Sequence, residues 1–308
     1  MRISTAQTWA TALNNLSGAQ SRENDANNQV SSQKVATDLE GYGRSSEIIA
    51  AYQSTLAKTN SYLTVNKTVS DRLSSQDLAL TTTSQSASDA KDSIMNALAS
   101  NDGTSLMQSI SGNFATALDG LNYQHDGQYL FGGGNDNTPP VTVNSLSQLA
   151  GASSSDAVFD NGTVKKTSRI DPNTTIQTGM LASDLGSKLM QTFQDIQKYN
   201  DDPATGPFGQ PLTDAQQAFL TTKSQEFNTE YSALTEQTAV NGTMQNRVTN
   251  STTSLTGQAS SLQGLIGDRT NADMATAYSN LQQAQVAVQA SSQVLANLNQ
   301  DSLLNLLK

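Results

Sequence analysis

The chain has 308 residues, a formal net charge of −10, no cysteine and a single histidine. These counts exclude disulfide frameworks, thiol nucleophiles, iron–sulfur clusters, cysteine-type zinc sites and metal motifs that need two histidines. Uncharged polar residues far outnumber charged ones, which are 14% of the chain, and aromatic residues are only 5%. This composition favours long helices that pack through Ala, Leu, Val and small polar side chains over a compact enzyme core. An acidic chain also has no bulk attraction to nucleic acid or to anionic lipid.

Neither a membrane span nor a secretory signal is predicted. No stretch approaches the roughly 18 consecutive apolar residues that a spanning helix needs. The opening, Met1-Arg2-Ile3-Ser4-Thr5, leads into mixed polar sequence and lacks the apolar region of a secretory signal. These tests alone predict a cytoplasmic protein without membrane insertion, although the absence of cysteine fits either redox compartment.

The N-terminal segment has a sparse apolar stripe at helical spacing, followed by very polar sequence over residues 17–28. A helix with so few apolar residues does not hold by itself, so it needs a partner, and the C-terminal helix is the candidate. The alternative is that both ends are frayed helices of a soluble bundle. The stripe consists of Ile3, Ala6, Trp9 or Ala10, Leu13 and Leu16.

A second heptad pattern predicts one long helix after the first loop. It is weaker than the C-terminal pattern, because polar residues fill several of its places. Its apolar members are Ile49, Tyr52, Leu56, Leu63, Leu73 and Leu80, with Thr59, Asn66, Ser70 and Asp77 in the remaining places.

The only histidine, His125, precedes Asp126 and is the sole candidate for acid–base chemistry. A histidine beside an aspartate can serve a serine nucleophile, but the chain has no Gly-x-Ser-x-Gly elbow. The glycines at 132–134 are not followed by the lysine of a phosphate loop. We therefore interpret His125 as structural or solvent-facing, and we predict no catalytic, cofactor-binding or metal-binding residues.

Prolines are confined to the middle of the chain, which separates two helical flanks. Between Pro140 and residue 180 the sequence is rich in Gly, Ser, Thr, Asn and β-branched residues, which predicts a small β-rich insertion over 139–180. The step Asn161-Gly162 lies between apolar residues and predicts a hairpin. The Pro- and Gly-rich stretch 201–209 predicts a loop between two helices.

The C-terminal helix has the clearest periodicity in the chain. Its apolar residues alternate in steps of three and four, which is the pattern of a coiled-coil seam. Asp268 or Asn271 is expected to cap its start. No charged residue occurs between Asp273 and Asp301, so we predict that other protein surrounds this helix. The seam consists of Met274, Ala277, Leu281, Ala284, Val288, Ser291, Leu295 and Leu298.

Three segments together resemble the flagellin superfamily, and within it the hook–filament junction proteins (the hook-associated protein 3 family). The opening at residues 1–5 is similar to the start of that family. The sequence GQYLFGGGNDNTPPV at 127–141 resembles the signature where the helical region leads into the β domain. The C-terminal motif, with Asp273-Met274-Ala275 and Ser302-Leu303-Leu304-Asn305-Leu306-Leu307, is shared across the superfamily. One loop departs from the pattern, because residues 31–44 contain Gln33 in place of a glycine and lack an Asp-Pro element.

The resemblance implies a mainly α fold in which the N- and C-terminal helices pair as a coiled coil beside a long helical bundle and a short β-rich outer domain. It implies a division into 1–45 with 265–308 as the polymer core, 46–138 with 181–264 as the helical rod, and 139–180 as the outer insertion. It also implies terminal segments that are largely disordered before assembly.

The function implied by the resemblance is that of a structural subunit of the bacterial flagellum, outside the cell. The protein would form an adapter ring that joins the hook side to the filament and templates flagellin assembly, without enzymatic activity or a cofactor. Implied partners are further copies of itself, the preceding hook-associated protein, flagellin, an export chaperone and the type III export apparatus. The expected assembly interface comprises Ile3, Trp9, Leu13, Leu16, Met274, Leu281, Val288, Leu295, Leu298, Leu303, Leu304, Leu306 and Leu307.

Three alternatives remain open at this point. The first is a flagellin filament subunit, which has the same architecture. The second is a secreted enzyme that uses His125. The third is a generic secreted coiled-coil protein, whose assembly would not need residues 1–30.

Overall fold

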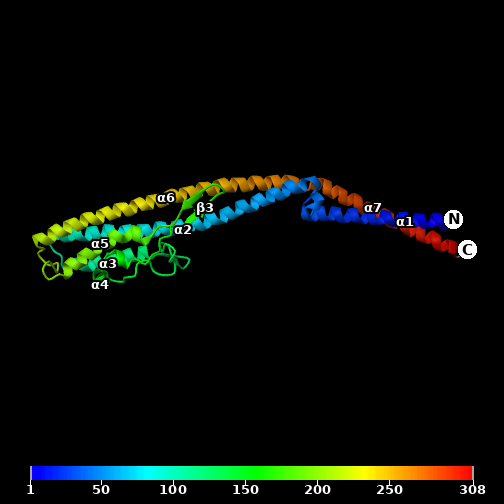
Figure 1. The fold of residues 1–308 in the computed structure, drawn as a ribbon. Helices are drawn as coiled ribbons and strands as arrows, with labels where there is room; N and C mark the ends of the chain where they lie inside the picture. Colours follow the sequence, from blue (N-terminus) through cyan, green and yellow to red (C-terminus); the bar gives the residue numbers. More distant parts are fainter. Residues whose placement is uncertain (1, 307–308) are drawn as a thin grey trace. The chain divides into compact units, whose positions relative to one another are not determined.

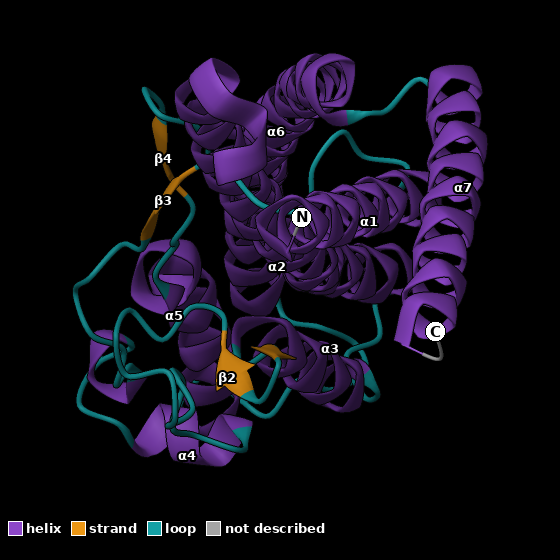
Figure 2. Ribbon diagram, turned by 90° about the vertical axis from the view of Figure 1, so that its right-hand side faces the viewer, coloured by secondary structure: helices purple, strands orange, loops and turns teal. Residues whose placement is uncertain are grey.

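The structure is a computed structural model that describes residues 2–306, with side chains described for residues 6–300. Long helices dominate it, and the strands are very short (Figures 1 and 2), which confirms the predicted mainly α fold with a small β component. The helices are α1 (Arg2–Ser32), α2 (Ser46–Ser100), α3 (Leu106–Leu121), α4 (Leu146–Gly151), α5 (Ala182–Asp201), α6 (Asp214–Thr270) and α7 (Met274–Leu306). The strands are β1 (Gln124–His125), β2 (Gln128–Tyr129), β3 (Thr167–Arg169) and β4 (Thr175–Gln177).

The chain forms two compact units. Residues up to Thr59 together with those from Gly257 onward form a terminal unit, and Asn60–Thr256 form a middle unit. The boundaries of these units lie inside α2 and α6. The predicted three-part division, which has its boundaries elsewhere, stays a prediction.

In the middle unit, α2 and α6 lie along each other through a seam that repeats every seventh residue. Because α2 is a single helix of 55 residues, the expectation of one long helix from the second heptad is confirmed. Hydrogen bonds cross the seam: Asn241 donates to the carbonyl of Leu73 (2.8 Å) and Asn66 donates to the hydroxyl of Ser251 (3.2 Å). The buried seam residues are Asn66, Leu73, Leu80, Ala87 and Ile94 on α2, and Leu220, Phe227, Leu234, Asn241, Val248 and Leu255 on α6.

One large hydrophobic core joins α2, α3, α5, α6 and the segment before α5. Phe193 lies at its centre, in edge-to-face contact with Phe114 (5.5 Å between ring centroids) and Phe227 (4.9 Å). Helix α3 packs so closely on α2 that a Cβ at Gly120 would lie 2.1 Å from the Thr83 hydroxyl. Residues of the predicted insertion, among them Leu149, are buried in the same core, so this segment is not packed as a separate body.

The hairpin predicted from the sequence does not form at its predicted place. The Asn161-Gly162 step forms no hairpin, so that prediction is wrong. Asn161 instead accepts a hydrogen bond from the Ser183 backbone in the first turn of α5 (3.0 Å), and Gly162 N–H donates to the Gly132 carbonyl (2.8 Å). The side-chain amide of Asn161 therefore ties its loop to the start of α5 and does not close a two-residue turn.

The β3–β4 hairpin forms ten residues further on, around Asp171. The Asp171 carboxylate accepts two backbone N–H groups of its turn at 2.7 Å each. Ile170 and Ile176 of this hairpin pack on Val69, Leu73 and Val248, so the hairpin lies over both α2 and α6 (Figure 1). The expected loop between two helices is confirmed, because α5 ends at Asp201 and α6 begins at Asp214.

A charged cluster between α5 and α6 gives a test of this packing. Lys223 donates to Asp195 (2.7 Å) and to Glu226 (2.9 Å). Glu230, one turn further along α6, is only 8% exposed. Burial raises the pKa of the Glu230 carboxyl, Lys188 opposes this and Glu226 adds to it. Because the folded-state pKa lies above the unfolded value, the stabilising contribution is present at low pH and is lost as pH rises through the folded pKa.

We therefore predict that Glu230→Gln stabilises the protein at neutral pH, because the amide removes a charge that burial disfavours. A gain of about 1 kcal/mol would raise Tm by roughly 3 °C. The measurement is thermal unfolding of both proteins between pH 5 and pH 8, where the difference should shrink as pH falls. Glu236→Gln on an exposed position of α6 is the matched control and should change Tm little at any of these pH values. A Tm for Glu230→Gln at or below that of the unmodified chain at pH 7 would contradict the prediction.

Candidate assembly surface

Helices α1 and α7 pack against each other in antiparallel orientation in the terminal unit (Figure 1). The covered side of α7 agrees with the predicted seam residue for residue. From residue 275 to residue 300, every position outside the seam is exposed except Ala287, and every member of the seam is buried or half-buried. The C-terminal heptad pattern therefore identifies the side of α7 that faces α1.

The covered side of α1 has the same three-and-four spacing but smaller residues than expected. Ala19 is fully buried, and Ala12 and Ala26 are 8% and 5% exposed. Opposite them α7 presents Ala277 and Ala284, which are 1% and 6% exposed. Small side chains on both helices let the two backbones approach closely. The members on α1 are Trp9, Ala12, Leu16, Ala19, Glu23, Ala26 and Val30.

The N-terminal stripe predicted from sequence is thus partly wrong for the contact within one chain. Trp9 and Leu16 lie in the seam, but Ala6 is exposed and Leu13 is 53% exposed. Leu13 follows Ala12 and is turned about 100° away from it around the helix. The sequence contains the correct pattern, because the steps from Trp9 through Ala12 and Leu16 to Ala19 already have coiled-coil spacing. The predicted stripe followed the large apolar residues, whereas the buried positions of α1 are mainly alanines.

Five of the predicted interface residues are not described in this respect. Ile3, Leu303, Leu304 and Leu306 lie in α1 and α7, but their side chains are outside the described set, and Leu307 lies outside the described residues. The other residues of α7 in that prediction, Met274, Leu281, Val288, Leu295 and Leu298, all lie in the seam and are half-buried. Their role between subunits stays a prediction.

A hydrogen-bonded clamp closes the pair where α1 ends and α7 begins. Lys34 and Asn271 form an antiparallel β-bridge, flanked by Val35 N–H to the Thr270 carbonyl (2.8 Å) and Ala272 N–H to the Gln33 carbonyl (2.9 Å). The Lys34 ammonium donates to the Asn271 side-chain oxygen (2.6 Å) and to the Thr270 hydroxyl (3.1 Å). The lysine of the departing loop thus ties the two terminal helices together at one end.

The cap of α7 is Asp273, not Asp268 or Asn271 as expected. Helix α6 continues through Asp268 to Thr270, so α7 begins later than the sequence suggested. The Asp273 carboxylate accepts hydrogen bonds from the Ala275 N–H (2.9 Å) and the Thr276 hydroxyl (3.0 Å). The hydrogen bond from the Thr276 hydroxyl lowers the pKa of the Asp273 carboxyl most, and the backbone N–H groups of Ala275 and Thr276 lower it further. The cap therefore stays ionised at neutral pH.

The exposed side of α7 carries large apolar residues and, from residue 274 to residue 300, no charge. On α7, Tyr278, Val286 and Val294 are 58%, 63% and 51% exposed. They point to three different sides of the helix, because each lies eight residues after the one before. On α1, residues 3–21 also contain no charged residue. A surface of this kind is typical of a helix pair that other protein covers.

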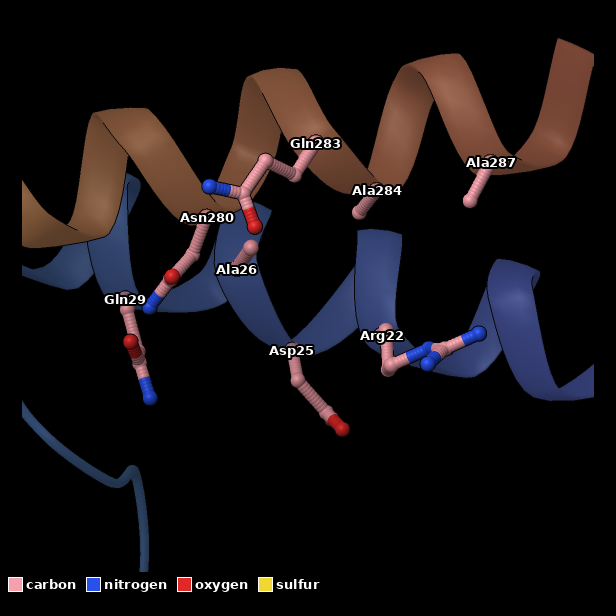
Figure 3. A pocket seen from close by; sticks show the side chains of 8 residues that line it. All are labelled: Arg22, Asp25, Ala26, Gln29, Asn280, Gln283, Ala284 and Ala287. Carbon is pink, nitrogen blue, oxygen red and sulfur yellow. The ribbon is translucent and has the colours of Figure 1, made fainter.

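A groove of about 430 Å³ runs between α1 and α7 near the clamp (Figure 3). Asn280 of α7 reaches towards α1 beside Gln29. The Asp25 side chain points away from α7. The lining combines small and uncharged polar residues of both helices with two charged residues of α1, Arg22 and Asp25.

The single histidine docks a hairpin onto α2. The Ser75 hydroxyl lies 2.9 Å from His125 Nδ1, and Asp126 Oδ2 lies 3.4 Å from Nε2. The Asp126 side chain is 86% exposed, and the Ser75 hydroxyl also donates to the Asp71 carbonyl (3.2 Å). Ser75 lies in the middle of α2, where the neighbouring backbone N–H groups are engaged in the helix. They are therefore not available to stabilise an oxyanion as a serine hydrolase requires.

The described residues contain neither a metal-binding cluster nor a helix that could cross a membrane. No group of three or more His, Cys, Asp or Glu side chains with metal-binding geometry occurs among them. Within the same part of the chain, no helix is both long enough and apolar enough to cross a membrane.

The C-terminal part of the chain matches a known protein family. Residues 225–307 match the sequence model of the bacterial flagellin C-terminal helical region. This stretch contains most of α6 and all of α7, so it includes the helix whose exposed side has no charge. Over these residues the match agrees with the resemblance drawn from the motifs: the chain contains a stretch similar to the C-terminal helical region of bacterial flagellins.

Two solved structures share the fold. One is a protein assigned as flagellar hook-associated from Vibrio parahaemolyticus, with a TM-score of 0.61 and 15% identity, covering 76% of this chain and 99% of that chain. The other is Bacillus cereus FlgL, with a TM-score of 0.54 and 16% identity, covering 70% of this chain and 97% of that chain. No curated protein shows significant sequence similarity to this chain.

The seam itself can be tested with one charge placed at its tightest point. We predict that Ala19→Asp separates α1 from α7, because burying the carboxylate costs at least about 2 kcal/mol and the seam has little apolar area to offset it. Far-UV circular dichroism should show a loss of helix, and amide exchange should accelerate along both α1 and α7. Asn15→Asp places the same charge on the exposed side of α1 and should leave both measurements unchanged. Equal effects of the two substitutions would show that the seam is not the contact.

Proposed function

We propose that this chain is a structural subunit of the bacterial flagellum, and that it forms an adapter ring between the hook side and the filament. The observation that carries the proposal is the α1–α7 pair, in which the exposed side of α7 has no charge from residue 274 to residue 300 and carries three large apolar residues among uncharged polar ones. The flagellin C-terminal match includes this helix, and the fold is shared with two hook-associated structures. The adapter position is the reading favoured by the motifs at residues 1–5 and 127–141.

The proposed mechanism is burial of the α1–α7 surface against neighbouring copies. Uncharged side chains lose little hydration free energy when they are covered, whereas each charged group at the same place would cost several kcal/mol. The ring would bind the preceding hook-associated protein on one side and flagellin on the other. The first flagellin layer would then pack on a surface of matching shape.

Location and delivery follow from the same proposal. The protein would act outside the cell, after export through the flagellar type III apparatus with the help of an export chaperone and without a cleaved signal peptide. No enzymatic activity is part of the proposal, because the Ser75–His125 contact lacks free oxyanion donors and serves to dock a hairpin.

A flagellin filament subunit is the second candidate, and the match of residues 225–307 to the flagellin C-terminal region favours it equally. The two candidates separate in a strain that lacks this gene. Bare hooks with flagellin shed into the medium are the result expected for an adapter, since flagellin is exported but finds no template. Filaments that remain attached to hooks would overturn the adapter role. Long homopolymers of the purified chain would favour the filament subunit.

A charge on the outer surface tests the proposed mechanism without disturbing the seam. We predict that Val286→Asp folds normally but is not incorporated into flagella, because its carboxylate would be buried against a neighbour. Val286→Asn is the matched control. Asparagine has nearly the same shape as aspartate but no charge, so this variant should be incorporated. The measurement is the amount of each variant in purified hook–filament preparations, with circular dichroism as the folding check. Normal incorporation of Val286→Asp would show that this side of α7 is not covered in the assembly.

A further inference from the structure

In the middle unit, several buried polar atoms lack a hydrogen-bond partner where the outer segment, residues 122–181 between α3 and α5, meets α2. Among the side chains that the structure describes, they are Arg72 Nε, Gln76 Oε1 and Asp136 Oδ1. The amide oxygens of Asn66 and Asn241, in the α2–α6 seam, are in the same condition. Native proteins usually satisfy such atoms with protein groups or with ordered water, because a buried polar atom without a partner costs stability.

Two of these side chains reach from α2 to the outer segment. Arg72 and Gln76 are four residues apart on α2, so they lie on the same side of the helix. Arg72 Nη2 donates to the Leu130 carbonyl (3.2 Å), and Gln76 Nε2 donates to the Thr178 carbonyl (2.9 Å). Gln76 is fully buried and Thr178 is 1% exposed. One face of α2 thus binds two stretches of the outer segment that are far apart in sequence.

Asp136 connects the same two stretches. Its backbone carbonyl accepts from the N–H of Tyr129 (2.9 Å), the residue before the carbonyl that Arg72 binds. Its carboxylate Oδ2 pairs with the Lys166 ammonium, and the Lys166 carbonyl accepts from the Thr178 N–H (2.9 Å). Burial lowers the pKa of the Arg72 guanidinium and the charge of Asp136 raises it, so these two side chains also interact.

Together with one turn of α2, these contacts close into a polar ring. Its members are Arg72, Gln76, Leu130, Asp136, Lys166 and Thr178. The three atoms without partners on Arg72, Gln76 and Asp136 all belong to this ring, and none of them is open to bulk solvent. They comprise one donor, the Arg72 Nε–H group, and two acceptor oxygens.

We propose that the polar ring binds one buried water molecule, which accepts a hydrogen bond from Arg72 Nε and donates to Gln76 Oε1 and Asp136 Oδ1. Buried waters in proteins typically make about three hydrogen bonds to groups of this kind. A small anion would face two acceptor oxygens, and a metal cation would face a guanidinium donor. Water is the ligand that matches one donor and two acceptors.

The bound water completes the docking of the outer segment on α2. Leu130 and Asp136 belong to residues 127–141, and Thr178 directly follows β4, so the water joins both stretches to the same turn of α2. Apolar residues such as Phe131 hold this segment in the core, but hydrophobic packing is not directional. Hydrogen bonds through the ring add direction. The inference goes beyond the proposed flagellar role and does not depend on it.

The experiment is oxygen-17 magnetic relaxation dispersion of water in solutions of the purified full-length chain, which counts waters held inside a folded protein. The double variant Arg72→Met with Gln76→Met replaces two of the three partners by apolar side chains of similar length. Asp136 Oδ1 alone does not retain a water, so we expect the variant to hold one long-lived water fewer than the unmodified chain.

A matched control and a folding check accompany this measurement. Arg247→Met with Gln258→Met makes the same two substitutions at exposed positions of α6 and should leave the count unchanged. Amide exchange in the core around Phe193 should remain slow in both double variants, which shows that they are folded.

A crystal structure of the unmodified full-length chain, at a resolution that shows ordered waters, tests the site without any substitution. We expect solvent density within hydrogen-bond distance of Arg72 Nε, Gln76 Oε1 and Asp136 Oδ1. A direct bond between Arg72 Nε and Asp136 Oδ1 with no water would overturn the inference. So would an anomalous bromide peak inside the ring after chloride is replaced by bromide, since it would identify an anion site. An equal water count in the folded unmodified chain and the folded Arg72→Met, Gln76→Met variant would overturn it as well.

Discussion

The contact between the two ends of the chain is the constraint on which the account depends. It joins helices that are separated by more than two hundred residues, and it does so with alanines rather than with large apolar side chains. A seam of this composition keeps two helices close but contributes little free energy by itself. The exposed side of α7 has no charge from residue 274 to residue 300. Both properties suit a segment that reaches its full stability only when neighbours cover it.

The middle unit is stabilised by large apolar side chains rather than by alanines. Its core around Phe193 is built from large side chains of α2, α3, α5 and α6, and the β3–β4 hairpin packs its isoleucines on apolar residues of the α2–α6 seam. Buried polar residues such as Asn66 and Asn241 cost stability, but they specify which residues lie opposite one another. The middle unit thus holds itself together, whereas the terminal pair depends on a clamp and on other protein.

Sequence patterns predicted the parts of this structure that repeat. The heptad from Met274 to Leu298 identified the covered side of α7, because a regular helix converts spacing into direction. The same reasoning failed where a side chain had a competing partner. Asn161 accepts a hydrogen bond from the first turn of α5 and forms no hairpin. Helix α6 continues through Asp268, so Asp273 is the residue that caps α7. The clamp could not be predicted at all, since Lys34 and Asn271 are far apart in sequence and no local signal connects them.

The absence of cysteine permits a direct test of the claim that neighbours cover this surface. A single Val286→Cys substitution places one thiol on α7, on the exposed side of the helix pair. The measurement is the rate of maleimide labelling in the free chain and in intact hook–filament preparations. The account predicts rapid labelling of the free chain and strong protection in the assembly. Equal labelling in both would mean that the uncharged surface remains open to solvent, and the proposed mode of assembly would be wrong.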